Sequence, residues 1–191
     1  MTRIVTFALT LALLGLCSAA VRAQIPVPTP TPNPQVYTDP GMEYDAPPEA
    51  RLAGRHEIPL EQLGEDLQPI AIWVIDPGKE DARVVQLQME AFDGPPNQWE
   101  GQFESQMHNQ QDGVLIKNRT PMTLTNGMPA TLVEVTYGDG FDAKKMYAVV
   151  FADGQRGIVL SETGRIGEIT EQEAQRVLKN AKAVRYPSDQ P

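Results

Sequence analysis

The sequence has few of the residues that usually hold metals. It contains one cysteine, Cys17, and two histidines, His56 and His108, among 191 residues. The two histidines stand alone, so neither belongs to an HxH, HxxxH or HExxH pattern that would bring two imidazoles to one ion. We interpret both as structural or solvent-exposed side chains. The sequence therefore assigns no metal ligand, and no cofactor is expected.

Arrangements that support nucleophilic catalysis are also missing. The chain has no GxSxG motif, and Ser161, in the stretch IVLSETG, lacks a neighbouring lysine or histidine in a spacing typical of enzymes. We interpret Ser161 as a hydroxyl at the end of a strand. The sequence assigns no catalytic residue and favours a protein that is not an enzyme.

Basic residues are outnumbered by acidic ones. The chain carries 16 Lys and Arg against 25 Asp and Glu, a net charge of −9, and its longest basic run is the pair Lys144-Lys145. Nucleic acids and anionic membrane surfaces repel such a charge. Neither is expected as a partner.

Residues 1–23 have the pattern of a secretory signal peptide: Arg3, an apolar run over residues 4–16, and small residues before Ala23. The run is 13 residues long, whereas a membrane-spanning helix needs about 20. We expect cleavage after Ala23 and a periplasmic or secreted protein with no stable transmembrane segment. An uncleaved anchor is one alternative, and lipidation of Cys17 is another, although Leu16 is large for the position before a lipidated cysteine.

Cleavage would leave the mature chain, which begins at Gln24, without a cysteine and hence without a disulfide or a thiolate metal site. It would also remove two arginines, so that the charge becomes 14 − 25 = −11. A mature chain of this kind depends on a packed core for its stability.

Proline is abundant after the signal peptide. It accounts for 8 of the 24 residues over 25–48, and each proline fixes φ and removes a backbone donor. We expect residues 24–48 to be a disordered, semi-rigid linker that cannot join a sheet. Docking of this segment in an aromatic groove of another protein is the alternative.

Residues 49–187 are expected to form one domain, followed by a disordered tail at 188–191. Strands are indicated by apolar or alternating runs and by turn signals between them. Asn126-Gly127 and Asp153-Gly154 supply the positive φ angles of tight hairpins, which predicts an antiparallel meander. The expected strands span residues 69–76, 84–92, 113–118, 122–125, 129–138, 145–152 and 157–162.

Two helices are expected beside this sheet. Trp99, Phe103 and Met107 are spaced by four residues and so share one helical face, with Asn97 as the N-cap and Gly113 as the stop. We expect the stripe to pack on the sheet; ligand stacking on Trp99 is the alternative.

The second helix is expected over residues 170–184. Thr170 and Glu173 have the spacing of a capping box. Its apolar positions follow the i, i+3, i+4, i+7 pattern of a helix that lies on a sheet; they are Ala174, Val177, Leu178 and Ala181.

Acidic residues gather in the stretches EDAR, YGDGFDAKK and SETGR. Asp139 and Asp142 lie beside glycines, but the DxDxDG ladder of a calcium loop is missing, so we expect a hairpin turn. A carboxylate-dependent hydrolase would need acids from these stretches to converge in one cleft.

The order of elements resembles a known group of proteins. The stretches QWEGQF, LTNGMPATLVEVTYG and MYAVVFADGQRGIVL, with the closing helix, resemble exported bacterial proteins of the PsbP-like and DcrB-like α/β/α sandwich group over residues 50–185. The resemblance implies an α+β fold in which helices flank a curved antiparallel meander. It also implies binding and assembly roles, and it carries no catalytic residue over to this chain.

These observations lead to one hypothesis and two alternatives. The hypothesis is an exported, non-enzymatic envelope protein that binds a protein partner or a small ligand. The first alternative is a carboxylate- or divalent-cation-dependent hydrolase acting on cell wall or polysaccharide. The second is a structural module whose sheet docks a neighbouring chain. No oligomeric state is assigned.

Overall fold

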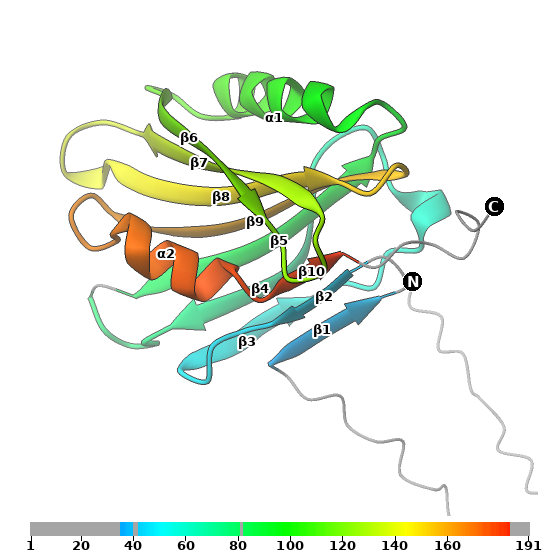
Figure 1. Cartoon of the computed structure of the whole chain (residues 1–191). Coiled ribbons are helices and arrows are strands. Elements are labelled where there is room, and N and C mark those ends of the chain that lie inside the picture. The colour runs from blue at the N-terminus through cyan, green and yellow to red at the C-terminus, as the bar shows by residue number, and fades with distance from the viewer. Residues whose placement is uncertain (1–34, 40–41, 81, 184–191) are drawn as a thin grey trace, which may run out of the picture. The chain divides into compact units, whose positions relative to one another are not determined.

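The computed structural model describes residues 35–39, 42–80 and 82–183 (Figure 1). The predicted signal peptide, Cys17 and the predicted tail lie outside these residues, so those predictions stay untested. The described residues form two antiparallel sheets and two α-helices. The α+β class and the sheet flanked by helices are therefore confirmed.

The larger sheet has seven strands in the order β3-β4-β5-β9-β8-β7-β6, all antiparallel. The strands that were predicted separately over 113–118 and 122–125 are one strand, β6. The seven strands are β3 (Ala50–Arg55), β4 (Gln68–Ile75), β5 (Arg83–Ala91), β6 (Leu115–Thr123), β7 (Pro129–Tyr137), β8 (Lys144–Ala152) and β9 (Arg156–Arg165).

The turn between β6 and β7 is the predicted Asn-Gly hairpin. Gly127 has φ of +89°, the left-handed conformation that glycine adopts without strain. The Asn126 side chain accepts a hydrogen bond from the Met128 amide at 3.1 Å, and the Leu124 amide donates to the Met128 carbonyl at 2.9 Å. Local sequence thus determines this turn.

Helix α1 (Pro96–Gln110) covers one face of the sheet. Trp99, Phe103 and Met107 are all buried against β7, β8 and β9, and the Trp99 indole donates to the Ile158 carbonyl at 3.2 Å. The predicted stripe is confirmed as packing.

The predicted start of α1 is wrong. Pro95 precedes the helix and Pro96 is its first residue, without a side-chain cap, because proline already has the helical φ and needs no donor there. Asn97 lies inside the first turn. At the other end the helix ends at Gln110, and Gly113, with φ of +65°, lies in the turn that follows.

The other face is covered by helix α2 (Glu171–Leu178) and a three-stranded sheet of order β1-β2-β10. The small sheet contains β1 (Val36–Asp39), β2 (Met42–Asp45) and β10 (Ala181–Ala183). Tyr44 of β2 packs edge-on against Trp73 of β4, with ring centroids 5.2 Å apart. The small sheet therefore lies over the β4 side of the large sheet.

This small sheet corrects two predictions. Residues 36–39 and 42–45 form strands, so the part of the 24–48 segment that the structure describes joins a sheet. The alternating prolines end at Pro34, and the apolar Met42 and Tyr44 are fully buried. The helix predicted to 184 ends at Leu178, and Ala181 belongs to β10, where it pairs with Tyr44.

The capping box at α2 is half confirmed. Thr170 Oγ1 accepts a hydrogen bond from the Glu173 amide at 3.3 Å. The Glu173 carboxylate, however, lies 2.5 Å from Arg83 Nη1 of β5 and not at the Thr170 amide. A buried cation is a stronger partner for a carboxylate than a backbone amide.

Candidate functional site

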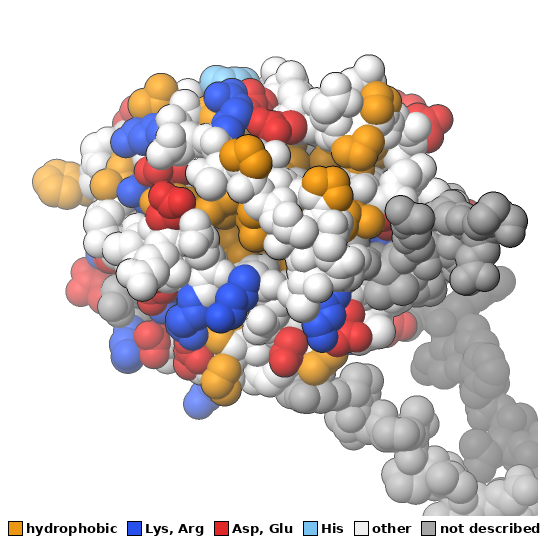
Figure 2. All heavy atoms as spheres, viewed as in Figure 1, with side chains coloured by type: hydrophobic (Ala, Val, Ile, Leu, Met, Phe, Trp, Pro, Cys, Tyr) orange, Lys and Arg blue, Asp and Glu red, His pale blue; other side chains and the backbone are white. Residues whose placement is uncertain are grey.

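A groove of about 730 Å³ lies between α2 and the β6–β7 edge of the sheet. We call it the α2–β6 groove. Figure 2 shows a hollow on this side of the molecule with hydrophobic side chains at its floor. Its lining residues are Thr120, Pro121, Met122, Leu132, Thr170, Gln172, Glu173, Gln175, Arg176 and Lys179.

The groove exists because α2 does not extend over the whole face. The helix has eight residues and packs on β9 and β8. Leu132 of β7 and Met122 of β6 lie on the same face and belong to the same apolar cluster, but they form the floor of the groove. Met122 is half-buried there and Leu132 is only 3% exposed, so the floor is apolar but well packed.

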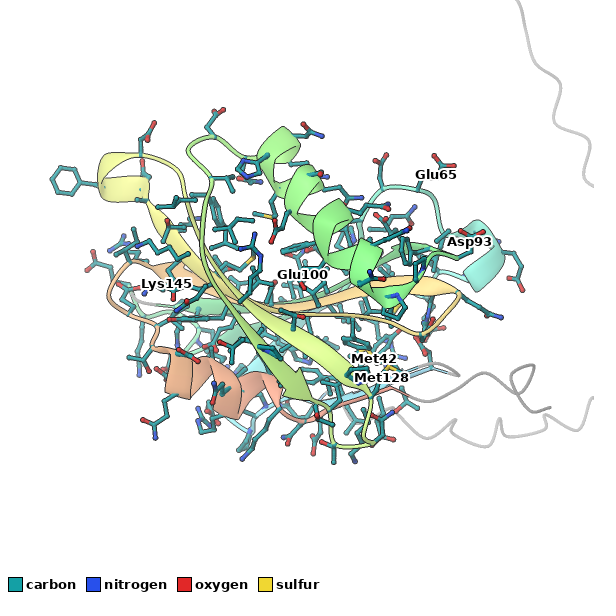
Figure 3. All side chains as sticks on the ribbon, turned by 45° about the horizontal axis from the view of Figure 1, so that its top comes forward. Met42, Glu65, Asp93, Glu100, Met128 and Lys145 are labelled. Atoms are coloured by element: carbon teal, nitrogen blue, oxygen red, sulfur yellow. The ribbon has the colours of Figure 1, made fainter. Side chains whose placement is uncertain are left out.

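The groove has one closed end. The Thr125 hydroxyl, in the β6–β7 turn, donates to the Lys179 carbonyl at the end of α2 at 3.0 Å. On the same face of the sheet and away from this turn, Lys145 Nζ lies 3.2 Å from the Glu134 carboxylate. Figure 3 shows Lys145 far from Met128, which follows the turn.

Behind the α2 wall lies a buried network of charged groups. Arg83 Nη1 is 2.8 Å from Glu162 and 2.5 Å from Glu173, so one guanidinium holds two carboxylates. Glu162 is fully buried, and its second oxygen has no partner among the described residues. Burial raises the pKa of the Glu162 carboxyl to about 7 against the attraction of Arg83.

The charges on the groove are partly compensated by neighbours. Glu173 is held by Arg83, and Arg176 Nη2 lies 2.7 Å from the Glu49 carboxylate. The pairing with Arg176 lowers the pKa of Glu49. Lys179 is exposed, and none of the described carboxylates forms an ion pair with it.

A second buried carboxylate lies on the α1 face of the sheet. Glu90 of β5 accepts hydrogen bonds from the Gln102 and Gln106 amides of α1. Burial raises the pKa of Glu90, and the two amide donors oppose that shift. The Gln106 carbonyl oxygen is buried without a partner among the described residues. We interpret this cluster as packing of α1 on the sheet.

The structure places the other candidate residues of the sequence apart from one another. His56 and His108 are exposed at separate positions. Ser161 is buried inside β9 opposite Gln86 and Ala148, so the prediction that it ends a strand is wrong. Within the part of the chain that the structure describes, no three His, Cys, Asp or Glu side chains are grouped to hold a metal ion.

The three acidic stretches do meet at one end of the sheet. Glu80, Asp142 and Arg165 line a hollow of about 270 Å³. Glu80 forms an exposed ion pair with Arg165 at 3.2 Å. Asp139 and Asp142 lie in the short turn between β7 and β8, as the glycines there predicted. This hollow brings together acids, but it does not bury them.

Sequence reasoning missed the floor and wall of the groove. Met122 and Leu132 appear in the sequence as the apolar positions of ordinary strands, and Lys179 as an outward residue of a helix. Nothing local signals that these residues share a groove, because their proximity comes from strand order.

No protein-family model matches the sequence, and no curated protein matches it either. Among solved structures, the cyanobacterial PsbP (CyanoP) from Synechocystis sp. PCC 6803 is 11% identical, with a TM-score of 0.55, over 78% of this chain and 91% of that one. LpqN, involved in cell envelope biogenesis of Mycobacterium tuberculosis, is 17% identical, with a TM-score of 0.52, over 78% and 87%.

None of the helices formed by the described residues is long and apolar enough to span a membrane. The likenesses to CyanoP and LpqN extend over most of all three chains, at identities that speak for the fold alone. The chain therefore has the fold of the PsbP-like and DcrB-like group.

Proposed function

We propose that this protein is an exported, non-enzymatic accessory protein of the cell envelope that binds a partner protein or a small ligand in the α2–β6 groove. The observation that carries the proposal is the groove of about 730 Å³ beside α2, whose floor is formed by the half-buried Met122 and the buried Leu132. Apolar hollows of several hundred cubic ångströms with a few polar groups on the rim are typical binding sites.

Three further observations support this role. Residues 1–23 have the pattern of an export signal. LpqN, which shares the fold, is described as involved in cell envelope biogenesis. The carboxylates of Glu80 and Asp142, which line the hollow of about 270 Å³, are exposed. Catalytic carboxylates depend on burial to shift their pKa values apart.

The groove can be tested with one pair of variants. Met122→Glu puts a charge on the floor, and Thr123→Glu puts the same charge on the next residue of β6, which is exposed and outside the groove lining. Immobilised full-length protein would be exposed to envelope extract, and bound protein and lipid would be identified by mass spectrometry. We expect Met122→Glu to lose the bound component and Thr123→Glu to retain it.

Circular dichroism of both variants separates loss of binding from loss of folding. A component that Met122→Glu still retains at the wild-type level, with both variants folded, would contradict the groove as the binding site. Turnover of a polysaccharide by the purified protein would contradict the non-enzymatic role.

The export proposal has its own measurement. Mass spectrometry of the protein isolated from its native host should give a chain that begins at Gln24. A mass that includes a lipid on Cys17, or the intact residues 1–23, would contradict cleavage after Ala23.

A further inference from the structure

The α2–β6 groove carries an excess of positive charge in an acidic protein. The chain has a net charge of −9, yet the charged residues that line the groove are Glu173, Arg176 and Lys179. Glu173 is drawn 2.5 Å from the buried Arg83 behind the helix. Glu173 is thus paired from inside and Arg176 with Glu49, so Lys179 is the charged residue of the lining that forms no ion pair with any described carboxylate.

The two cations have the spacing that lets them hold one anion together. Arg176 lies in α2 and Lys179 is its C-cap residue with helical φ and ψ, so the two side chains, three residues apart, emerge on the same side about one turn apart. Glu49 engages Nη2 of Arg176, and half of the Arg176 side chain is exposed. The Lys179 ammonium is exposed and has no carboxylate partner among the described residues.

The position of this pair along the groove fixes where the anion would lie. Lys179 is at the closed end, where its carbonyl accepts the hydrogen bond from Thr125. From that end the floor runs from Met122, just before the turn, to Leu132, which pairs with Thr120 of β6. The lining therefore matches a molecule with an anionic head at one end and an apolar chain behind it.

An extended peptide is a poorer match for the same groove. A peptide beside an edge strand is usually held by adding a further strand to the sheet. Strand β6 is the edge, but Pro121 in its middle has no amide to donate, and the pairing with β7 is irregular between Ile116 and Asn118. Proline and bulges are features that keep further strands from adding to an edge.

We propose that the α2–β6 groove binds a single-chain amphiphile with a carboxylate head, its chain on Met122 and Leu132 and its carboxylate between Arg176 and Lys179. A guanidinium and an ammonium both bind a carboxylate through charge-assisted hydrogen bonds, and arginine can hold it with two of them. This inference rests on the proposed function, because it names the ligand class of the same groove.

The test is isothermal titration calorimetry on the full-length chain with dodecanoate below its micelle concentration, at about pH 8, where the carboxylate is ionised. Dodecyltrimethylammonium supplies the same chain with a cationic head. We expect dodecanoate to bind the wild type and the cationic amphiphile to bind more weakly. Lys179→Glu should weaken dodecanoate binding by roughly five- to tenfold, because an attraction becomes a repulsion.

Lys117→Glu is the matched control. Lys117 is an exposed lysine of β6 that does not line the groove, so its reversal changes the net charge equally and should leave dodecanoate affinity unchanged. Equal affinity for the two amphiphiles, an unchanged affinity in Lys179→Glu, or no dodecanoate binding would each overturn the proposed ligand class.

The proposed function and the proposed ligand class can be contradicted independently of each other. If dodecanoate does not bind but Met122→Glu still loses an envelope component that Thr123→Glu retains, the groove is a binding site for a different ligand. If neither effect is seen, both proposals are wrong.

Discussion

The two faces of the seven-stranded sheet are covered in different ways. On one face, α1 has 15 residues and places Trp99, Phe103 and Met107 in the apolar layer over β7, β8 and β9. It also reaches the β6 edge, where Arg119 forms ion pairs with Glu104 at 2.6 Å and with Glu100 at 3.2 Å. The layer beneath α1 is buried, whereas Val84 of β5, on the same face, is 37% exposed.

The opposite face is divided between two short elements. The small sheet packs over β4 through Tyr44 and Trp73, and the eight-residue α2 packs over β9 and β8. Strands β7 and β6 form the floor of the groove, where Leu132 is buried and Met122 is half-buried. The comparison teaches that a binding hollow can arise from a covering helix that is too short for its sheet, without any special residue type.

Each face also buries one glutamate, with different partners. Glu90 under α1 is held by two neutral amides, whereas Glu162 under α2 is held by the Arg83 guanidinium. Amides cannot compensate the charge of a buried carboxylate, and a cation can do so only in part. At both sites burial raises the carboxyl pKa against the effect of these partners, but only the site at Glu162 extends through Arg83 to a residue that lines the groove.

The largest effect on stability is expected from removing a side chain that packs α1 on the sheet. Trp99 is fully buried and donates a hydrogen bond to the Ile158 carbonyl, so Trp99→Ala removes its packing and leaves a cavity. We expect the free energy of unfolding to fall by about 3–5 kcal/mol, measured by urea denaturation. Gln175→Ala, on the exposed wall of the groove, is the control and should change it by less than about 0.5 kcal/mol.

The next largest effect is expected on the α2 face, where stability should depend on pH. The Glu162 carboxyl has a pKa raised from 4.5 to about 7 in the folded protein, so the folded state binds this proton more tightly than the unfolded state. The contribution of the Glu162 proton to the free energy of unfolding is fully present below the unfolded pKa of 4.5. It is lost as the pH rises through the folded pKa of about 7. The loss is on the order of 1–3 kcal/mol.

Glu162→Gln removes this titration. Denaturation of the wild type and of Glu162→Gln should be measured between pH 4.5 and about pH 7. The free energy of unfolding should change less with pH in the variant. Parallel curves for the two proteins would mean that Glu162 does not titrate there. Glu80→Gln, which removes an exposed carboxylate outside the network, is the control and should leave the curve unchanged.

The hairpin that closes the groove gives a smaller effect. Gly127 has φ of +89° and open space where a Cβ would lie, so Gly127→Val meets backbone strain and not a clash. We expect a loss of about 1–2 kcal/mol in the free energy of unfolding, seen as a lower melting temperature. Lost binding with an unchanged melting temperature would show that this turn contacts the ligand and is more than scaffold.

The smallest effect is expected at the groove floor. Met122 is only partly buried on an edge strand, so Met122→Ala should cost no more than about 1 kcal/mol of stability, less than the substitution of a sealed core residue. The same variant should weaken ligand binding if the floor contacts the ligand. A loss comparable to that of Trp99→Ala would mean that the strip is covered in solution and that no open groove exists.

Prediction from the sequence worked best where the structure depends on local patterns. The alternation of Val85, Leu87 and Met89 predicted β5, and the four-residue spacing of Trp99, Phe103 and Met107 predicted the buried face of α1. It failed where a distant partner decides the conformation. Ala181 continues the helical pattern of α2, but it pairs with Tyr44 of β2, more than a hundred residues earlier.

The groove was beyond prediction for a related reason. Thr120 and Met122 come close to Arg176 and Lys179 only because β6 is at the end of the sheet order and α2 ends early. The sequence shows which residues are apolar. Which of them a helix covers depends on how far that helix extends across the sheet, and many packing contacts together decide that.

The sequence by itself determined the local features: the hairpin turns, the alternating strands, the buried stripe of α1 and the Thr170 cap. Each of these depends on neighbours within a few residues, where sterics and periodicity decide the conformation. Only the tertiary structure decided which strands lie under a helix, which carboxylates share Arg83, and which apolar side chains stay open to a ligand. Those outcomes follow from contacts between segments far apart in the chain, and no local pattern encodes them.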